Sequence, residues 1–303
     1  MLLTEFIKEG VRGLEPLYPT KEAHTIILML CESVLGTRSY THIVEPHYEI
    51  APDKQEILDG SLALLCAGEP IQYIVGYSEF CGFRFKVTPD VLIPRPETEL
   101  LVRSMVNEAS RIRRSRAAYG KSAAPVRILD LCTGSGCIAW TVALNVPGVE
   151  VVAVDISEAA LEVARGQFSG HDIKEKGITC PLFVRADVLD TEQEFDHGVF
   201  DLIVSNPPYV MESEKSRMRK NVLDYEPAQA LFVPDDDPLV FYRAIARWSE
   251  RFLADDGKAM TEINEALGRE TEEVFRSAGF HYTETVKDFF DRNRFVRYSR
   301  IEL

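Results

Sequence analysis

The sequence lacks any long apolar run. Its longest uninterrupted apolar stretches, such as Ile26–Cys31, are far shorter than the roughly 18–20 residues that a membrane-spanning helix needs. The first residues carry acidic side chains and lack both the apolar core and the small-residue cleavage site of a signal peptide. We therefore expect a cytoplasmic protein without membrane association.

The sequence also lacks paired cysteines and clustered metal ligands. Its six cysteines are scattered, with no CxxC pair, which is typical of free thiols in a reducing compartment. The histidines show no ligand spacing, so no metal site is expected. The cysteines are Cys31, Cys66, Cys81, Cys132, Cys137 and Cys180.

Basic residues are too few to balance the acidic ones. The 34 Lys and Arg residues stand against 48 Asp and Glu residues, which gives a net charge of −14. Like charge opposes the approach of a polyphosphate chain, so no stable nucleic-acid binding is expected, although a local basic groove would still permit it. At 303 residues the chain is long enough for two domains.

The pattern of apolar residues changes twice along the chain. Residues 1–70 show helical spacing interrupted by prolines, which predicts a helical N-terminal domain. Residues 71–95 contain the aromatic and β-branched run IQYIVGYSEFCGFRFKV, which predicts a β-hairpin linker. Residues 96–303 form the third predicted region.

Strand and helix patterns alternate through this third region. The predicted strands are 126–131, 149–155, 181–187, 200–206, 258–264, 280–287 and 294–301, and the predicted helices are 137–145, 158–168, 238–254 and 266–277. This alternation is typical of an α/β fold in which helices cover both faces of a mostly parallel sheet. Ligands in such folds bind at the carboxyl ends of the strands.

Three strand ends carry residues suited to an adenosine-bearing ligand. The first is followed by the glycine turn Asp130-Leu-Cys-Thr-Gly-Ser-Gly136, whose glycines let a ligand approach the backbone. Asp155 ends the second strand, where a carboxylate can accept from both ribose hydroxyls. Asp187 ends the third and is suited to the adenine amino group. A turn without a ligand, or a nicotinamide dinucleotide bound through the GxGxxA pattern from Gly134, stays an alternative.

The fourth strand end, Ser205-Asn206-Pro207-Pro208-Tyr209, is poor in donors. Two successive prolines remove two backbone N–H groups and hold Asn206 in an extended conformation. Carbonyl oxygens beside an aromatic face suit a planar NH₂ group, as in adenine, cytosine or a glutamine amide. A purely structural turn is the alternative.

Together these strand ends predict methyl transfer from S-adenosylmethionine to an NH₂ nitrogen. Acceptors on the N–H bonds favour the charge that develops at nitrogen in the transition state. A cofactor-binding adaptor without catalysis and a nicotinamide-dependent oxidoreductase are the alternatives from other classes.

Several longer motifs resemble the HemK family of protein-(glutamine-N5) methyltransferases. The motifs are VLIPRPETELLV (91–102), ILDLCTGSGCIA (128–139), VVAVDISEAALEVAR (151–165), SNPPYV (205–210) and GEPIQYIVGYSEF (68–80). The resemblance implies a Rossmann-like, seven-stranded S-adenosylmethionine-dependent methyltransferase domain. It also implies a substrate, the glutamine of the Gly-Gly-Gln motif of peptide chain release factors, and an N-terminal domain that docks this substrate.

The resemblance also assigns the site residues. The cofactor would be held by Asp130, Cys132, Thr133, Gly134, Ser135, Gly136, Asp155, Asp187, Val188 and Asn206. The target amide would be bound by Asn206, Pro207, Pro208 and Tyr209, of which Asn206, Pro207 and Tyr209 are the expected catalytic residues.

Two positions depart from the family pattern. The family usually has glycine in place of Cys132, where we expect an ordinary φ and only a change in packing. Some members have an aromatic residue in place of Val188, so adenine stacking is expected to be weaker. The nearest rival function is methylation of adenine or cytosine in nucleic acid, which the acidic charge disfavours. We expect a monomer.

Overall fold

The chain divides into two compact units. The computed structural model describes residues 1–118, 124–168, 173 and 177–302. One unit contains Met1–Tyr77 and Met218–Tyr225, and the other contains Ser78–Arg217 and Glu226–Leu303. The boundary therefore lies at Tyr77/Ser78, and a short later segment joins the first unit.

The first unit is helical. It contains α1 (Leu3–Leu14), α2 (Thr20–Leu35), α3 (Thr41–Val44), α4 (Pro52–Ala67), α5 (Ile71–Val75) and α10 (Lys220–Tyr225). Pro19 and Pro52 precede or open helices, and Gly36 and Gly68 end α2 and α4 in the left-handed conformation. The apolar faces of these helices form one core, which includes Leu3, Phe6, Leu14, Ile27, Leu30, Leu58 and Leu65. The prediction of a helical N-terminal region is confirmed.

The segment around α10 is held in this unit by polar contacts. Arg219 forms an ion pair with Glu22 at 2.5 Å, and its guanidinium lies over the ring of Tyr18. The hydroxyl of Tyr225 donates to the carbonyl of Ala67 at 3.2 Å. A piece of the chain that follows the SNPPY loop is thus bound to the helical unit.

The predicted hairpin is shorter than the sequence indicated. Residues 71–75 form the helix α5, and only β1 (Tyr77–Phe80) and β2 (Phe83–Lys86) are extended. A short apolar run fits a strand or a buried helical turn equally well, and here Pro70 begins and Gly76 ends a helix. Cys81 and Gly82 connect the strands with φ values of +50° and +79°, as a tight hairpin turn requires.

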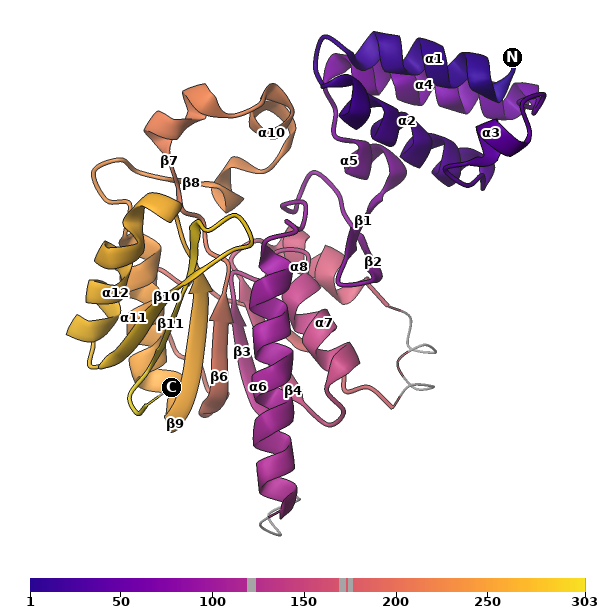
Figure 1. The fold of residues 1–303 in the computed structure, drawn as a ribbon. Helices are drawn as coiled ribbons and strands as arrows, with labels where there is room; N and C mark the ends of the chain where they lie inside the picture. Colours follow the sequence, from indigo (N-terminus) through magenta and orange to yellow (C-terminus); the bar gives the residue numbers. More distant parts are fainter. Residues whose placement is uncertain (119–123, 169–172, 174–176, 303) are drawn as a thin grey trace. The chain divides into compact units, whose positions relative to one another are not determined.

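The second unit is built around a seven-stranded sheet. Its strand order is β10-β11-β9-β6-β3-β4-β5 (Figure 1). β11 runs antiparallel to both of its neighbours, β10 and β9, and the other neighbouring strands pair in parallel. The strands are β3 (Arg127–Leu131), β4 (Glu150–Asp155), β5 (Leu182–Arg185), β6 (Phe200–Ser205), β9 (Leu253–Glu262), β10 (Tyr282–Lys287) and β11 (Asn293–Ser299). All seven predicted strands are confirmed, although β9 begins inside the predicted helix 238–254. The chain order reverses between β3 and β6, where such folds bind ligands.

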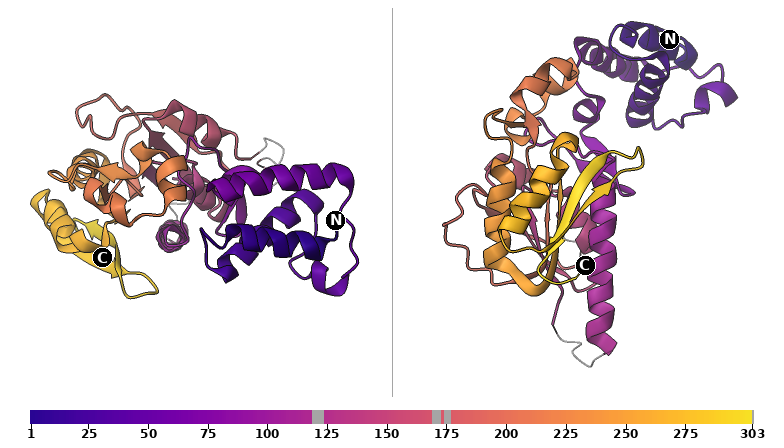
Figure 2. Two further views of the ribbon diagram at one scale, coloured as in Figure 1. Left: turned by 90° about the horizontal axis from the view of Figure 1, so that it is seen from above. Right: turned by 60° about the vertical axis from the view of Figure 1, so that its left-hand side comes forward.

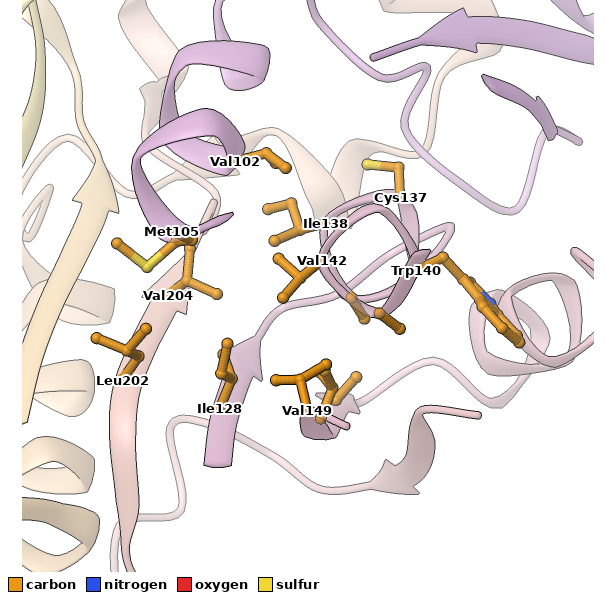
Figure 3. Close-up of a cluster of buried hydrophobic side chains, with 14 of the residues drawn as sticks. Val102, Met105, Ile128, Cys137, Ile138, Trp140, Val142, Val149, Leu202 and Val204 are labelled. Atoms are coloured by element: carbon orange, nitrogen blue, oxygen red, sulfur yellow. The ribbon is translucent and has the colours of Figure 1, made fainter. Parts of the chain in front are cut away.

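Helices cover both faces of this sheet (Figure 2). They are α6 (Thr98–Ala118), α7 (Cys137–Asn145) and α8 (Glu158–Arg165) on one face and α11 (Val240–Phe252) and α12 (Gly268–Ser277) on the other. In Figure 3, Met105 of α6 lies beside Val204 of β6, and Val102 of α6 lies beside Ile138 of α7. Leu202 belongs to the same core. Phe80 and Phe85 of the hairpin join this core, so the hairpin belongs to the second unit.

Shorter elements follow β6. They are β7 (Val210–Met211), β8 (Phe232–Val233), and the 3-10 turns η1 (Glu212–Arg217), η2 (Ala228–Ala230) and η3 (Glu265–Leu267). β7 and β8 pair in parallel as a separate two-stranded sheet. In the parts of the chain described here, no helix combines the length and apolar character needed to cross a bilayer.

Candidate active site

A cavity of about 440 Å³ lies at the carboxyl ends of the parallel strands. Its wall contains residues from the segments 90–98, 132–138, 155–160, 187–189, 206–208 and 227–241. Four of these segments directly follow β3, β4, β5 and β6, as the sequence predicted. The volume is in the range of small-molecule sites, roughly 300–1,000 Å³.

The glycine turn bends sharply over the end of β3. Cys132, Gly134 and Gly136 have φ values of +62°, +54° and +76°. The expectation of an ordinary φ at Cys132 was therefore wrong: the turn directs the Thr133 N–H to the Val154 carbonyl at 2.9 Å and needs a left-handed residue before it. A Cβ at Gly136 would lie 2.9 Å from the Cβ of Ala164, so close packing as well as φ requires glycine there.

Asp155 connects the turn to the end of β4. Its Oδ2 accepts from Gly134 N at 2.8 Å, and its Oδ1 accepts from Ser157 N at 3.0 Å. Burial raises the pKa of this carboxyl, although the backbone N–H groups counteract the effect. Each oxygen keeps a second lone pair, and Asp155 lines the cavity, so it can accept two further hydrogen bonds from a diol.

Asp130 is placed beneath the turn. It is fully buried and is not part of the cavity wall, although the sequence grouped it with the cofactor-binding residues. Its Oδ2 accepts from the hydroxyl of Thr133 at 2.6 Å, and burial raises its pKa to about 7. Its position indicates that it supports the turn from below.

The wall next to β5 is apolar with one carboxylate. Asp187 and Val188 lie there as predicted, and Asp187 also accepts from Leu189 N at 2.9 Å. Ile156 and Leu189, which the sequence reasoning missed, are 38% and 43% exposed and line the same cavity. Each directly follows a predicted site residue, Asp155 or Val188, and that position was the available signal. Such a slot suits a flat heterocycle.

The SNPPY loop divides its residues between the cavity and the core behind it. Asn206 and Pro208 line the cavity, whereas Pro207 and Tyr209 are not in its wall. Tyr209 packs against the core beneath, and its hydroxyl donates to Glu262 Oε1 at 3.0 Å. Its pKa is raised well above the ordinary value by burial and by Glu262. The sequence predicted that the aromatic face of Tyr209 lies beside the target NH₂ group. The structure contradicts this prediction, because Tyr209 does not line the cavity.

Other wall residues come from segments to which the sequence reasoning gave no site role. Thr98, at the start of α6, lines the cavity, and Asn206 Nδ2 donates to its hydroxyl at 3.2 Å. Arg95 also lines it and pairs with the buried carboxylate of Glu226 at 2.8 Å. The segment after SNPPY contributes Phe232 among others, so part of that segment forms a wall of the cavity.

The donors and acceptors of this cavity fit an adenosine-bearing cofactor such as S-adenosylmethionine. Asp155 suits the ribose, the slot at Val188 and Leu189 suits the base, and the positive-φ turn at Gly134 suits close approach of a ligand. No group of three or more side chains that could hold a metal ion occurs in the described segments.

Comparisons with known proteins give consistent matches. The family model "Methyltransferase small domain" matches residues 118–229, and "PrmC N-terminal domain" matches residues 5–76. A release factor glutamine methyltransferase of Bacteroides thetaiotaomicron is 38% identical, covering 98% of this chain and 99% of its own. One of Flavobacterium psychrophilum is 36% identical with the same coverage. Among solved structures, a T. thermophilus 16S rRNA N2 G1207 methyltransferase in complex with AdoMet and guanosine is 16% identical, with a TM-score of 0.49, covering 74% of this chain and 50% of that one.

Proposed function

Because the chain belongs to the release factor glutamine methyltransferase family, we propose that it methylates peptide chain release factors. The methyl group comes from S-adenosylmethionine and goes to the side-chain amide nitrogen of the glutamine in the Gly-Gly-Gln motif. The observation that carries the proposal is that the Asp155 carboxylate and the Asn206 acceptor loop line one cavity. A protein that only binds the cofactor, without catalysis, would not need the Asn206 acceptor loop.

The residues of the loop act on the target nitrogen. S-adenosylmethionine, when bound, supplies an electrophilic methyl carbon on a positively charged sulfur. An amide nitrogen is a weak nucleophile because its lone pair is delocalised into the carbonyl. The Asn206 side-chain oxygen and the backbone carbonyls of the loop accept the two N–H hydrogens and stabilise the positive charge that develops there. Methyl transfer would form the N–C bond at the expense of the S–C bond of the cofactor, whose sulfur would become neutral, and the displaced N–H proton would pass to bulk water.

The remaining residues fix positions. Asp155 and the glycine turn hold the cofactor, and the wall at Val188 excludes water from the base. Holding nitrogen and methyl carbon at contact distance converts a bimolecular step into an effectively unimolecular one. Asn206 lines the same cavity as Asp155 and is suited to touch both ligands.

The wider assignments belong to the same proposal. The helical unit binds the body of the release factor, and the enzyme works as a cytoplasmic monomer without stable nucleic-acid binding. The net charge of −14 supports this last statement, because it disfavours contact with phosphate backbones.

The test uses S-adenosylmethionine labelled at the methyl group. We expect label in a purified release factor and none in a release factor whose motif glutamine is replaced by alanine. Label that persists in the Gln→Ala release factor would contradict the assigned substrate. Labelling of RNA or DNA in preference to protein would favour nucleic-acid methylation instead.

A further inference from the structure

A chain of buried hydrogen bonds lies behind the Asn206 side chain. Asn206 Nδ2 donates to Thr98 Oγ1 at 3.2 Å, and the Thr98 hydroxyl donates to Glu262 Oε2 at 2.7 Å. The other oxygen of Glu262, Oε1, accepts from the Tyr209 hydroxyl at 3.0 Å. The chain therefore links the loop after β6, the start of α6 and the end of β9.

The number of protons in this chain fixes its direction. An ionised carboxylate only accepts, so both hydroxyl groups donate to Glu262. The Thr98 hydroxyl has a single proton, and it donates this proton to Glu262. The hydroxyl oxygen can therefore only accept a hydrogen bond from Asn206. Asn206 must then present its NH₂ group to Thr98.

This direction decides which end of the Asn206 amide is available. The NH₂ group is held by Thr98, and no donor in the described part of the chain bonds to Asn206 Oδ1. Asn206 lines the cavity and is partly exposed, whereas Thr98, although also in the cavity wall, is only 2% exposed, and Glu262 is only 1% exposed. The side-chain oxygen is therefore the end left for a ligand. A flipped amide would present two N–H groups to the target nitrogen, which carries N–H groups itself.

Glu262 is well placed to keep this direction. Burial raises its pKa, while the two hydroxyl donors and the charge of Arg294 counteract that effect. Arg294 itself is held by Asp288 at 3.1 Å. The carboxylate thus has donors on both oxygens and a cation nearby.

We propose that Thr98 is a positioning residue for methyl transfer. Because its hydroxyl donates to Glu262, it can only accept from Asn206, and it thereby fixes the orientation of the Asn206 amide. It acts through Asn206 and does not itself need to touch the reacting atoms. This inference rests on the proposed function, since it assumes an NH₂ group as the target.

The test removes the Thr98 hydroxyl at nearly constant shape. In Thr98→Val the Asn206 amide loses the one hydrogen-bond partner that it has among the described residues. We expect kcat to fall about 10- to 100-fold, because the loss concerns an interaction that matters in the transition state. Thr98→Ser keeps the hydroxyl and should retain kcat within about threefold. Rates are expressed per binding site for S-adenosylhomocysteine, so that misfolded protein is not counted.

A matched control comes from another buried threonine. Thr271 is fully buried in α12, and its hydroxyl has no partner in the described part of the chain. Thr271→Val should leave kcat unchanged. Should Thr98→Val fold poorly, Thr98→Ala removes the same hydroxyl without added bulk.

The outcomes separate this inference from the proposed function. We expect the loss in kcat, with unchanged affinity for S-adenosylhomocysteine and rescue by Thr98→Ser. If the wild type methylates the release factor and Thr98→Val and Thr98→Ala do so equally fast, the positioning role is wrong. Equal losses of kcat in Thr98→Ser and Thr98→Val would also overturn it. If the wild type itself fails to methylate the release factor, the proposed function is wrong.

Discussion

Replacing Asp155 by asparagine tests the cofactor site without changing its shape. Both carboxylate oxygens already accept a backbone N–H, from Gly134 at 2.8 Å and from Ser157 at 3.0 Å. An asparagine has one acceptor oxygen, so its NH₂ group must face one of these two donors. The substitution therefore removes one backbone hydrogen bond in any orientation.

The magnitude follows from the two kinds of bond that are lost. A hydrogen bond to a charged group contributes roughly 1.5–3 kcal/mol, so the loss of a charged acceptor for the ribose weakens binding about 10- to 150-fold. The unpaired backbone donor costs about 1–3 kcal/mol in unfolding free energy. We therefore expect weaker binding of S-adenosylhomocysteine together with a lower unfolding temperature.

Isothermal titration calorimetry with S-adenosylhomocysteine measures the first effect, and thermal unfolding measures the second. Glu158→Gln is the matched control: it removes a charge three residues further on, from a side chain that pairs with Arg165 at the surface and is 48% exposed. Binding by Asp155→Asn within threefold of the wild type would refute the role assigned to this carboxylate.

The pH dependence of binding gives a second measurement on Asp155. Burial raises its pKa above the ordinary value, so the charged form is lost as the pH falls through that raised value. Wild-type affinity should therefore fall on acidification at a higher pH than for an exposed aspartate. The asparagine variant should lack this component.

Substitutions at three further positions test the supports of the site. Asp130 has a pKa of about 7 when folded against 3.8 ordinarily, so its contribution to stability is full below pH 4 and is lost as the pH rises to about 7. Asp130→Asn should raise the unfolding free energy at pH 8 by up to roughly 4 kcal/mol, about 1.4 kcal/mol per pKa unit; urea unfolding that shows an unchanged pH dependence would contradict this. The Cys132→Gly variant should unfold at a higher temperature than the Cys132→Ala variant. The left-handed φ at this position costs a non-glycine residue about 1–2 kcal/mol, which exceeds the stability of about 0.5–1 kcal/mol that alanine usually gains over glycine by restricting the unfolded chain. The reverse order of unfolding temperatures would show that the turn relaxes. Glu226→Ala leaves both Arg95 and the backbone N–H of Ile93 without their acceptor and should lower the unfolding free energy by about 2–3 kcal/mol in urea titrations, whereas a change below 0.5 kcal/mol would show that water replaces the carboxylate.

The sheet and the residues at its strand ends could be predicted from the sequence. A strand buried on both faces appears as a short apolar run, and the polar residue that follows it lies at the carboxyl edge. Asp155 and Asn206 were expected at strand ends by this reasoning, and both lie there, in the wall of one cavity. Predicting which residues lie at the carboxyl ends of the strands did not require the order of the strands in the sheet.

Local conformation was harder to predict where two physical effects compete. Residues 71–75 are apolar and partly β-branched, yet they form a helix between Pro70 and Gly76. At Cys132 the preference of a non-glycine residue for negative φ is overruled by the hydrogen bond between Thr133 N and the Val154 carbonyl. In both places the flanking geometry decided the conformation.

The parts of the site that no strand end supplies depend on long-range packing. Thr98 and Glu262 are 164 positions apart in the sequence. Each also has a purely structural interpretation, because Thr98 is the first residue of a helix and Glu262 is the last residue of a strand. They meet because α6 packs across β6 and β9 through the apolar face that contains Val102 and Met105. That core fixes the start of α6 beside the Asn206 loop. The orientation of the Asn206 amide in the cavity therefore depends on apolar contacts along the whole of α6. A substitution such as Met105→Ala loosens this face. It should lower kcat for methyl transfer, by disturbing the position of Thr98, before it weakens the binding of S-adenosylhomocysteine.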